Sequence, residues 1–338
     1  MTAVAVVGAG HWGKNLVRNF ARLPDADLAY VCDLDPDIRG RMAALYPATR
    51  ITGSFAEVLA DDTVDAVVIA TAAPSHFPLA RRALAAGRHT FVEKPLTLGV
   101  GDAAELERLA ADVDRKLMVG HLMEYHGAVN YMKELMDGGE IGDPLYLYLQ
   151  RVNLGVVRTD ENAWWSLAPH DISIACYLFG ADPVRVSASG HAYLQQGIED
   201  VVFASLTFPD GRMAHIHVSW LDPHKIRKVT LVGSSKMLVL DDMQAGEQVR
   251  IYDKGAVVPG VDSFHEAITL RVGDIRIPKL PAAEPLQAEC QHFLDSIRDD
   301  RQPRSDGADG LRVVKVLQAG ADSLRQGGVP VDLQEEAT

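Results

Sequence analysis

The chain has 338 residues, with 33 basic and 46 acidic side chains and a formal net charge of −13. This acidic balance argues against a nucleic-acid-binding surface and against binding to an anionic membrane. The length exceeds that of one ordinary core, so we expect two domains, and a composition of 47% hydrophobic and 23% charged residues is typical of soluble globular proteins.

The three cysteines, Cys32, Cys176 and Cys290, are odd in number and far apart. They match neither a disulfide framework nor the spacing of metal ligands, so we expect reduced thiols and a cytoplasmic location. The apolar runs are shorter than the roughly 20 residues of a membrane span, and the first ten residues lack a basic leader. We therefore expect no membrane association.

Short apolar runs alternate with helical stretches from the N-terminus to about residue 120. Predicted strands cover 4–8, 26–33, 65–71, 89–95 and 116–121, and predicted helices cover 12–23, 37–46, 76–87 and 100–114. Strands that alternate with helices indicate a doubly wound parallel sheet. We therefore expect residues 1–122 to form a Rossmann domain of the α/β class.

The pattern changes after residue 123, where a helix at 128–139 is followed mainly by strands. Predicted strands cover 145–153, 183–192, 200–208, 212–221, 226–233, 235–242 and 247–253, and further helices cover 168–180, 286–299 and 307–327. Short turns such as Pro209-Asp210-Gly211 indicate hairpins. Residues 123–338 are thus predicted to form an α+β domain with a large, open, mostly antiparallel sheet.

Gly8, Gly10 and Gly13 lie between the first predicted strand and the first predicted helix. This is the dinucleotide-binding turn, in which the helix N-terminus, here with His11 and Trp12, offers amides to a pyrophosphate. Asp33 ends the second strand, twenty residues after Gly13, where a carboxylate binds ribose hydroxyls and repels a 2′-phosphate. NAD is therefore the expected cofactor.

Polar side chains follow three further strands of the same predicted sheet. Because ligands of open α/β sheets bind at the carboxyl ends of the strands, these side chains are expected to lie near the nicotinamide. They are Thr71, Pro74 and His76, then Glu93 and Lys94, then Glu124 and Tyr125.

The glycine turn, Asp33, "TAAPSH", "EKP" and "APHDISI" occur in an order that resembles the glucose-fructose oxidoreductase/inositol dehydrogenase (Gfo/Idh/MocA) family. The resemblance covers nearly the whole chain. It implies that Lys94 is catalytic, that the Lys94-Pro95 bond is cis, and that His170 is the partner of Lys94. Many members have Asp four residues before this His, where the present sequence has Ser166. A histidine at a helix start, with Pro169 in the first turn, is the plain structural alternative.

Oxidation of an alcohol by NAD needs a base for the hydroxyl proton and a positive neighbour for the oxygen. We expect His170 to be the base and Lys94 the neighbour, although the sequence leaves the two roles exchangeable. The resemblance implies a sugar substrate. The variant "WSLAPHDISI" is most similar to UDP-N-acetylglucosamine-type 3-dehydrogenases, and an aminosugar of an antibiotic pathway is the alternative.

Several residues around the predicted 168–180 helix could contact such a substrate. Aromatic faces stack on sugars and bases, and arginines pair with phosphate; ordinary packing is the alternative for each. The candidates are Arg151, Asn153, Arg158, Trp164, Trp165 and Ser166, together with Glu124 and Tyr125 from the strand ends.

His215 and His217 share one face of a predicted strand, but no suitably spaced carboxylate or cysteine accompanies them, so we expect no metal site. They are expected to face a neighbouring strand or subunit. The resemblance further implies a homodimer or homotetramer formed through the open sheet. Two other functions stay open, namely an NAD-dependent glycosidase that oxidises C3 transiently and an NAD-binding regulator without turnover.

Overall fold

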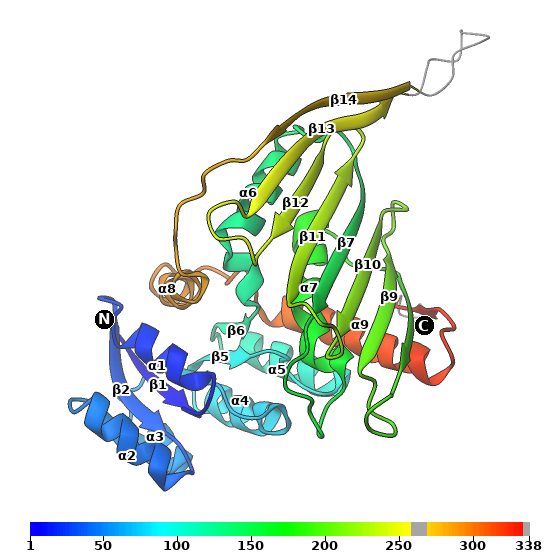
Figure 1. The fold of residues 1–338 in the computed structure, drawn as a ribbon. Coiled ribbons are helices and arrows are strands. Elements are labelled where there is room, and N and C mark those ends of the chain that lie inside the picture. The colour runs from blue at the N-terminus through cyan, green and yellow to red at the C-terminus, as the bar shows by residue number, and fades with distance from the viewer. Residues whose placement is uncertain (258–268, 334–338) are drawn as a thin grey trace. The chain divides into compact units, whose positions relative to one another are not determined.

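The computed structural model describes residues 1–257 and 269–333. By internal contacts the chain divides into two units, Met1–Tyr125 with Ala283–Lys315, and His126–Ala282 with Val316–Thr338. Figure 1 draws both units. From the sequence, all of 123–338 was assigned to the second domain. That assignment is wrong for 283–315, because these residues pack in the core of the first unit.

Among the described residues, the first unit contains a six-stranded, wholly parallel sheet in the order β3-β2-β1-β4-β5-β6. This confirms the doubly wound sheet. The sequence analysis missed the short β3 and α3. The strands are β1 (Thr2–Val7), β2 (Ala26–Cys32), β3 (Arg50–Thr52), β4 (Ala66–Ile69), β5 (His89–Glu93) and β6 (Leu117–Gly120). The helices are α1 (Gly13–Phe20), α2 (Pro36–Leu45), α3 (Phe55–Ala60), α4 (His76–Ala85), α5 (Val100–Asp112) and α8 (Pro285–Arg298), with short 3₁₀ turns η1 (Ala73–Ser75) and η2 (Leu122–Tyr125).

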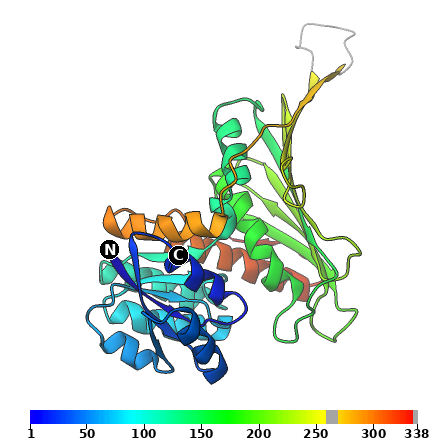
Figure 2. The ribbon, with the colours of Figure 1, turned by 60° about the vertical axis from the view of Figure 1, so that its left-hand side comes forward.

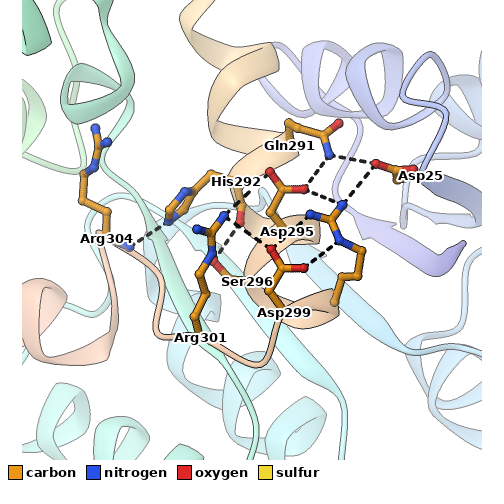
Figure 3. Close-up of polar contacts among 9 residues, drawn as sticks. Asp25, Gln291, His292, Asp295, Ser296, Asp299, Arg301 and Arg304 are labelled. Atoms are coloured by element: carbon orange, nitrogen blue, oxygen red, sulfur yellow. Dashed lines mark hydrogen bonds and ion pairs between the residues drawn. The ribbon is translucent and has the colours of Figure 1, made fainter.

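Helix α8 completes the core of the first unit although it comes late in the chain. Its Cys290 and Phe293 are fully buried, and the ring of Phe293 meets that of Phe91 on β5 edge-on at 5.7 Å. Polar contacts on the outer side of α8 reach Asp25, which precedes β2, through Gln291 at 3.1 Å (Figure 3). The three cysteines are all buried and free.

The described part of the second unit contains a nine-stranded sheet in the order β14-β13-β12-β11-β7-β10-β9-β8-β15. Only the pairing of β7 with β10 is parallel within it, so the mostly antiparallel sheet is confirmed. The sequence analysis missed β14 and β15. The strands are β7 (Pro144–Val152), β8 (Arg185–His191), β9 (Val201–Thr207), β10 (Met213–Ser219), β11 (Ile226–Gly233), β12 (Met237–Asp241), β13 (Val249–Val257), β14 (Thr269–Arg276) and β15 (Val331–Asp332).

Helices α6 (Gly127–Asp137) and α7 (Ala163–Phe179) lie against one face of the nine-stranded sheet (Figure 2), and α9 (Gly307–Arg325) begins in the first unit and ends in the second. Alternation along β10 explains the two faces. Ala214, Ile216 and Val218 are fully buried, whereas His215 and His217 point to the other face. There His217 stacks on Phe203 at 4.3 Å, as expected for side chains that face a neighbouring strand.

No helix in 1–257 or 269–333 combines the length and apolar character needed to cross a membrane.

Candidate active site

The turn between β1 and α1 has the geometry that a dinucleotide requires. Gly8 adopts φ +87°, and a Cβ there would lie 2.8 Å from the carbonyl oxygen of Ala70. A Cβ on Gly13 would lie 2.0 Å from the carbonyl oxygen of Gly8, so this contact also requires glycine. At Gly10 a Cβ would meet nothing within 4 Å, which leaves the backbone open to a ligand. The residues present therefore fit NAD.

Asp33 follows β2 and borders the same turn. One carboxylate oxygen accepts a hydrogen bond from the Ala9 amide at 2.7 Å, and the other accepts from the Asp35 amide at 2.9 Å. Asp35 itself caps α2 by accepting from the Asp37 amide. The carboxylate of Asp33 is thus fixed in place and remains partly exposed, as an acceptor for ribose hydroxyls must be.

Lys94 directly follows β5, and the preceding residue, Glu93, is held by several contacts. The carboxylate of Glu93 accepts hydrogen bonds from the indole of Trp12 and from the amide of Lys94, the latter at 3.2 Å. It lies over Gly120 of β6, where a Cβ would come within 2.9 Å of it. Burial raises the pKa of Glu93. The Lys94-Pro95 bond is cis, as the resemblance implies.

His76 lies between two of the predicted strand ends. Its Nδ1 lies 2.8 Å from the carbonyl oxygen of Pro95, and its Nε2 lies 3.0 Å from that of Thr71. Burial lowers the pKa of His76, whose side chain is 1% exposed. The neutral ring has one N–H and donates to one of these two carbonyls, and it is packed between the Lys94 loop and the end of β4. This burial argues against the expected contact with the cofactor. Pro74 is exposed in η1, and Thr71 accepts from Ser75 at 2.7 Å.

Beyond β6 the structure brings together three buried side chains, His121, Glu124 and Asp309, whose ligand atoms lie within 4.8 Å of one another. Nδ1 of His121 and a carboxylate oxygen of Asp309 lie 2.5 Å apart. Burial opposes the charge on His121, but Asp309 outweighs it and raises the His121 pKa to about 9. Burial and then the charge of Asp309 raise the Glu124 pKa to about 8.

Sequence patterns did not predict this cluster, because Asp309 is 188 residues away from His121. A divalent ion at about 2.0–2.2 Å from each ligand would have to separate the bonded pair. The cluster also corrects two substrate expectations. Glu124 is 2% exposed inside it, and the hydroxyl of Tyr125 bonds to that of Ser305 at 2.9 Å with 6% of the side chain exposed. Both residues belong to the core of the first unit.

His170 lies in the middle of α7, seven residues after its first residue, Ala163. The helix-start alternative is therefore wrong, because Asn162 caps the true start by accepting from the Trp165 amide at 3.1 Å. Pro169 lies inside the helix, and Ser166 is buried one turn before His170.

The predicted substrate residues of the second unit separate into two groups. Trp164 is fully buried and donates its indole N–H to the carbonyl of Leu317 at 2.9 Å, so it is a core residue and the expectation is wrong. Arg151 is 6% exposed and bonded to Asp171. Asn153, Arg158 and Trp165 are at least partly exposed, and the segment 153–162 has no helix or strand, as expected. These three stay predictions.

Two family models match the chain. The model for oxidoreductases with an NAD-binding Rossmann fold matches residues 2–121, and that for the GFO/IDH/MocA C-terminal domain matches residues 129–239.

Individual relatives match over nearly full length. UDP-N-acetylglucosamine 3-dehydrogenase of Acidithiobacillus ferrooxidans is 30% identical over 91% of this chain and 93% of its own. The scyllo-inositol 2-dehydrogenase (NAD(+)) of Bacillus subtilis is 27% identical over 97% and 95%. The crystal structure of GenD2 from gentamicin A biosynthesis, in complex with NAD, is 25% identical with a TM-score of 0.82 over 99% and 97%. The chain is thus an NAD-binding oxidoreductase and belongs to the Gfo/Idh/MocA family.

Proposed function

We propose that this oxidoreductase oxidises a secondary hydroxyl, at C3, of a nucleotide-linked sugar or of an aminosugar from an antibiotic pathway. The observation that carries the proposal is the pair of family positions that the chain retains, Lys94 directly after Glu93 and His170 on α7. The relative from Acidithiobacillus ferrooxidans, by its name, acts at position 3 of UDP-N-acetylglucosamine. The inositol relatives support the coarser class, a secondary hydroxyl on a six-membered ring.

In the proposed reaction the alcohol loses one hydrogen as a hydride and the other as a proton. NAD, when bound, supplies the acceptor for the hydride from carbon. His170 takes the hydroxyl proton as general base, and the ammonium of Lys94 donates a hydrogen bond to the oxygen as its negative charge develops. The product is the ketone, and the same groups run the reduction in reverse.

Two contacts of neighbouring residues hold the backbone on either side of Lys94. Glu93 accepts from the Lys94 amide, and His76 approaches the carbonyl of Pro95 on the other side. The loop is therefore fastened before and after the lysine. A fixed donor adds more to catalysis than a mobile one, since it needs no reorganisation as charge develops.

We also propose that the protein assembles through the face of the nine-stranded sheet that carries His215 and His217. Phe203 on this face is 45% exposed, and Tyr146 and Met213 are 48% and 47% exposed. Apolar side chains that gather on one sheet face are typical of a protein interface.

The test is NADH formation from NAD⁺ with a panel of nucleotide sugars, free sugars and aminoglycosides, with products identified by mass. We expect one substrate to give NADH and a product two hydrogens lighter. Lys94→Met and His170→Asn should each lower kcat by about 10²–10⁴-fold. The matched controls Lys279→Met and His191→Asn, at exposed positions, should keep the wild-type rate.

Other outcomes contradict the proposal in distinct ways. Release of an aglycone without accumulation of NADH indicates a glycosidase. Full activity in His170→Asn removes that residue from the reaction. Unchanged sugars throughout, with tight binding of NADH, indicate a regulator.

A further inference from the structure

A buried ion pair joins α7 to the centre of the nine-stranded sheet. Nε of Arg151 on β7 donates to one carboxylate oxygen of Asp171 at 2.9 Å, and a terminal nitrogen donates to the other at 3.0 Å. Arg151 is 6% exposed and Asp171 is 1% exposed. Two parallel bonds between planar groups fix orientation as well as distance.

The arginine is itself held on a rigid part of the sheet. β7 pairs with β10 on one side and β11 on the other, and Arg151 follows Leu149 on the buried face. Its cross-strand neighbour on β11 is Arg227, so two cations lie side by side on neighbouring strands. Burial and then the charge of Arg151 lower the pKa of Arg227. Like charges in this arrangement repel, so nearby carboxylates are needed to keep both in place.

Asp242 is the second carboxylate. It lies 3.2 Å from Nε2 of His126, whose Nδ1 accepts from the Ala128 amide at 3.2 Å and thereby caps α6. Nδ1 is therefore the acceptor and Nε2 the donor on this ring. Burial opposes ionisation of Asp242, but the hydrogen bond from His126 and the charges of Arg151 and Arg227 lower its pKa. Asp171, Arg151, Arg227, Asp242 and His126 form what we name the Arg151 cluster.

The Arg151 cluster contacts α7 at the turn where a backbone hydrogen bond of the helix is missing. Pro169 has no amide hydrogen, so the helix lacks the bond that this residue would donate to the carbonyl of Trp165. His170 comes next, followed directly by Asp171. Successive residues of an α-helix are about 100° apart around its axis. Holding Asp171 by two bonds therefore sets the direction in which His170 leaves the helix.

We propose that Arg151 and Asp171 are positioning residues for His170, an inference that rests on the proposed function of His170 as the base. Both side chains are buried and bonded to each other, which favours a role in positioning over one in binding the substrate. Arg227 and Asp242 complete the charge balance that keeps the guanidinium of Arg151 facing α7.

Kinetics separate positioning from simple stability. We expect Arg151→Met and Asp171→Asn to lower kcat by about 10–100-fold, since small misplacements of a catalytic group have effects of this size. The KM for NAD should stay within about twofold, and Arg151→Lys, which keeps the charge but not the planar fork, should restore kcat only in part. The matched control is Arg185→Met, which breaks an exposed arginine–aspartate pair and should change neither value.

A double variant makes the test independent of folding defects. Replacing a buried ion pair by apolar residues often restores stability. Arg151→Met/Asp171→Leu is therefore expected to recover the wild-type melting temperature while kcat stays low. Wild-type kcat in this double variant would overturn the proposal, because the pair would then serve stability alone.

A second readout needs no turnover. The rate at which diethyl pyrocarbonate modifies His170, followed by peptide mass spectrometry, should change at least threefold in Arg151→Met, with His191 as internal reference. If His170 reactivity changes although no substrate is oxidised, the positioning holds and only the proposed function fails. If folded variants keep both the reactivity of His170 and the wild-type kcat, the positioning inference is wrong.

Discussion

The selectivity that we predict for NAD over NADP rests on one carboxylate and its surroundings. Asp33 is fixed by the amides of Ala9 and Asp35, so its negative charge stays where the adenosine ribose of NAD is expected. Arg39 lies next to it and donates to the carbonyl oxygens of Asp33 and Leu34 at 2.9 and 2.8 Å. A cation is therefore already present should the carboxylate be removed.

We expect Asp33→Ser to lower kcat/KM for NAD by about 10–100-fold, because a charge-assisted hydrogen bond contributes about 1.5–3 kcal/mol. The same change should raise kcat/KM for NADP, since the repulsion of a 2′-phosphate is removed beside Arg39. Initial rates with both cofactors measure this. The exposed Asp112→Asn serves as the control. An unchanged ratio between the two cofactors would exclude Asp33 as the selecting residue.

The candidate site residues were predicted from short motifs, whereas the contacts around them were not. Lys94, His170, Asp33 and the glycine turn come from such motifs and from the family resemblance, and the roles of Lys94 and His170 stay predictions. The roles of His76, Asp309 and Asp171 depend on partners far along the chain, such as Asp309 for His121. Short sequence patterns cannot predict such long-range pairs. Trp164 was misassigned for the same reason, because its burial depends on the distant α9.

Among the secondary-structure elements, η2 and α9, with His121 directly after β6, form a buried cluster whose protonation couples to folding. Asp309 near the start of α9 raises the pKa of His121 to about 9 from an ordinary value of 6.5. The folded chain thus keeps a proton that the unfolded chain loses. This contribution to stability is complete below pH 6.5 and is lost as the pH rises through 9. Glu124, with its pKa raised to about 8, adds a change of the same sign.

We therefore expect the free energy of unfolding to fall between pH 6.5 and 9, at up to about 1.4 kcal/mol per pH unit for each extra proton held. Urea unfolding at a series of pH values measures this. Glu124→Gln, which cannot ionise, should give a shallower dependence than Asp112→Asn. Stability that rises over this range would show that the cluster does not hold these protons.

Elements were predicted well where the periodicity is long and uninterrupted. The sequence places α8 and α9 within a few residues, and their amphipathic patterns explain this. It starts α7 five residues late, at Ala168, because Pro169 resembles a helix-start residue and Asn162 is a less obvious cap. The short β3 and β15, of three and two residues, have too few positions to show an alternation.

For the whole molecule, the division into two units shows what chain order cannot reveal. Residues 283–315 follow the nine-stranded sheet in sequence but pack with the first unit, where Phe293 and Leu294 fill its core. The family model that matches residues 129–239 likewise ends before them. A helix pattern predicts that α8 exists and which of its sides is apolar, but not which of two cores it enters.

The assembly that we propose uses the face of the nine-stranded sheet that carries His215 and His217, where aromatic rings are stacked. Tyr148 stacks on His215 at 5.6 Å, and Phe203 stacks on His217 at 4.3 Å. Burial lowers the pKa of both histidines, so both are neutral near pH 7. A neutral aromatic face can pack against a second copy of itself in a two-fold interface, because the same patch then serves both subunits.

We expect wild-type protein to have the mass of two or four chains by light scattering, and Phe203→Glu to have the mass of one. A carboxylate in the centre of this face would be buried without a partner on association, and two-fold symmetry would add a second charge close to the first. The matched control is Leu45→Glu on α2, at a side chain that is 66% exposed in the first unit, which should leave the mass unchanged. If Phe203→Glu keeps the wild-type mass and circular dichroism, assembly uses another surface. If the wild type has the mass of one chain, the open sheet face has no role in assembly.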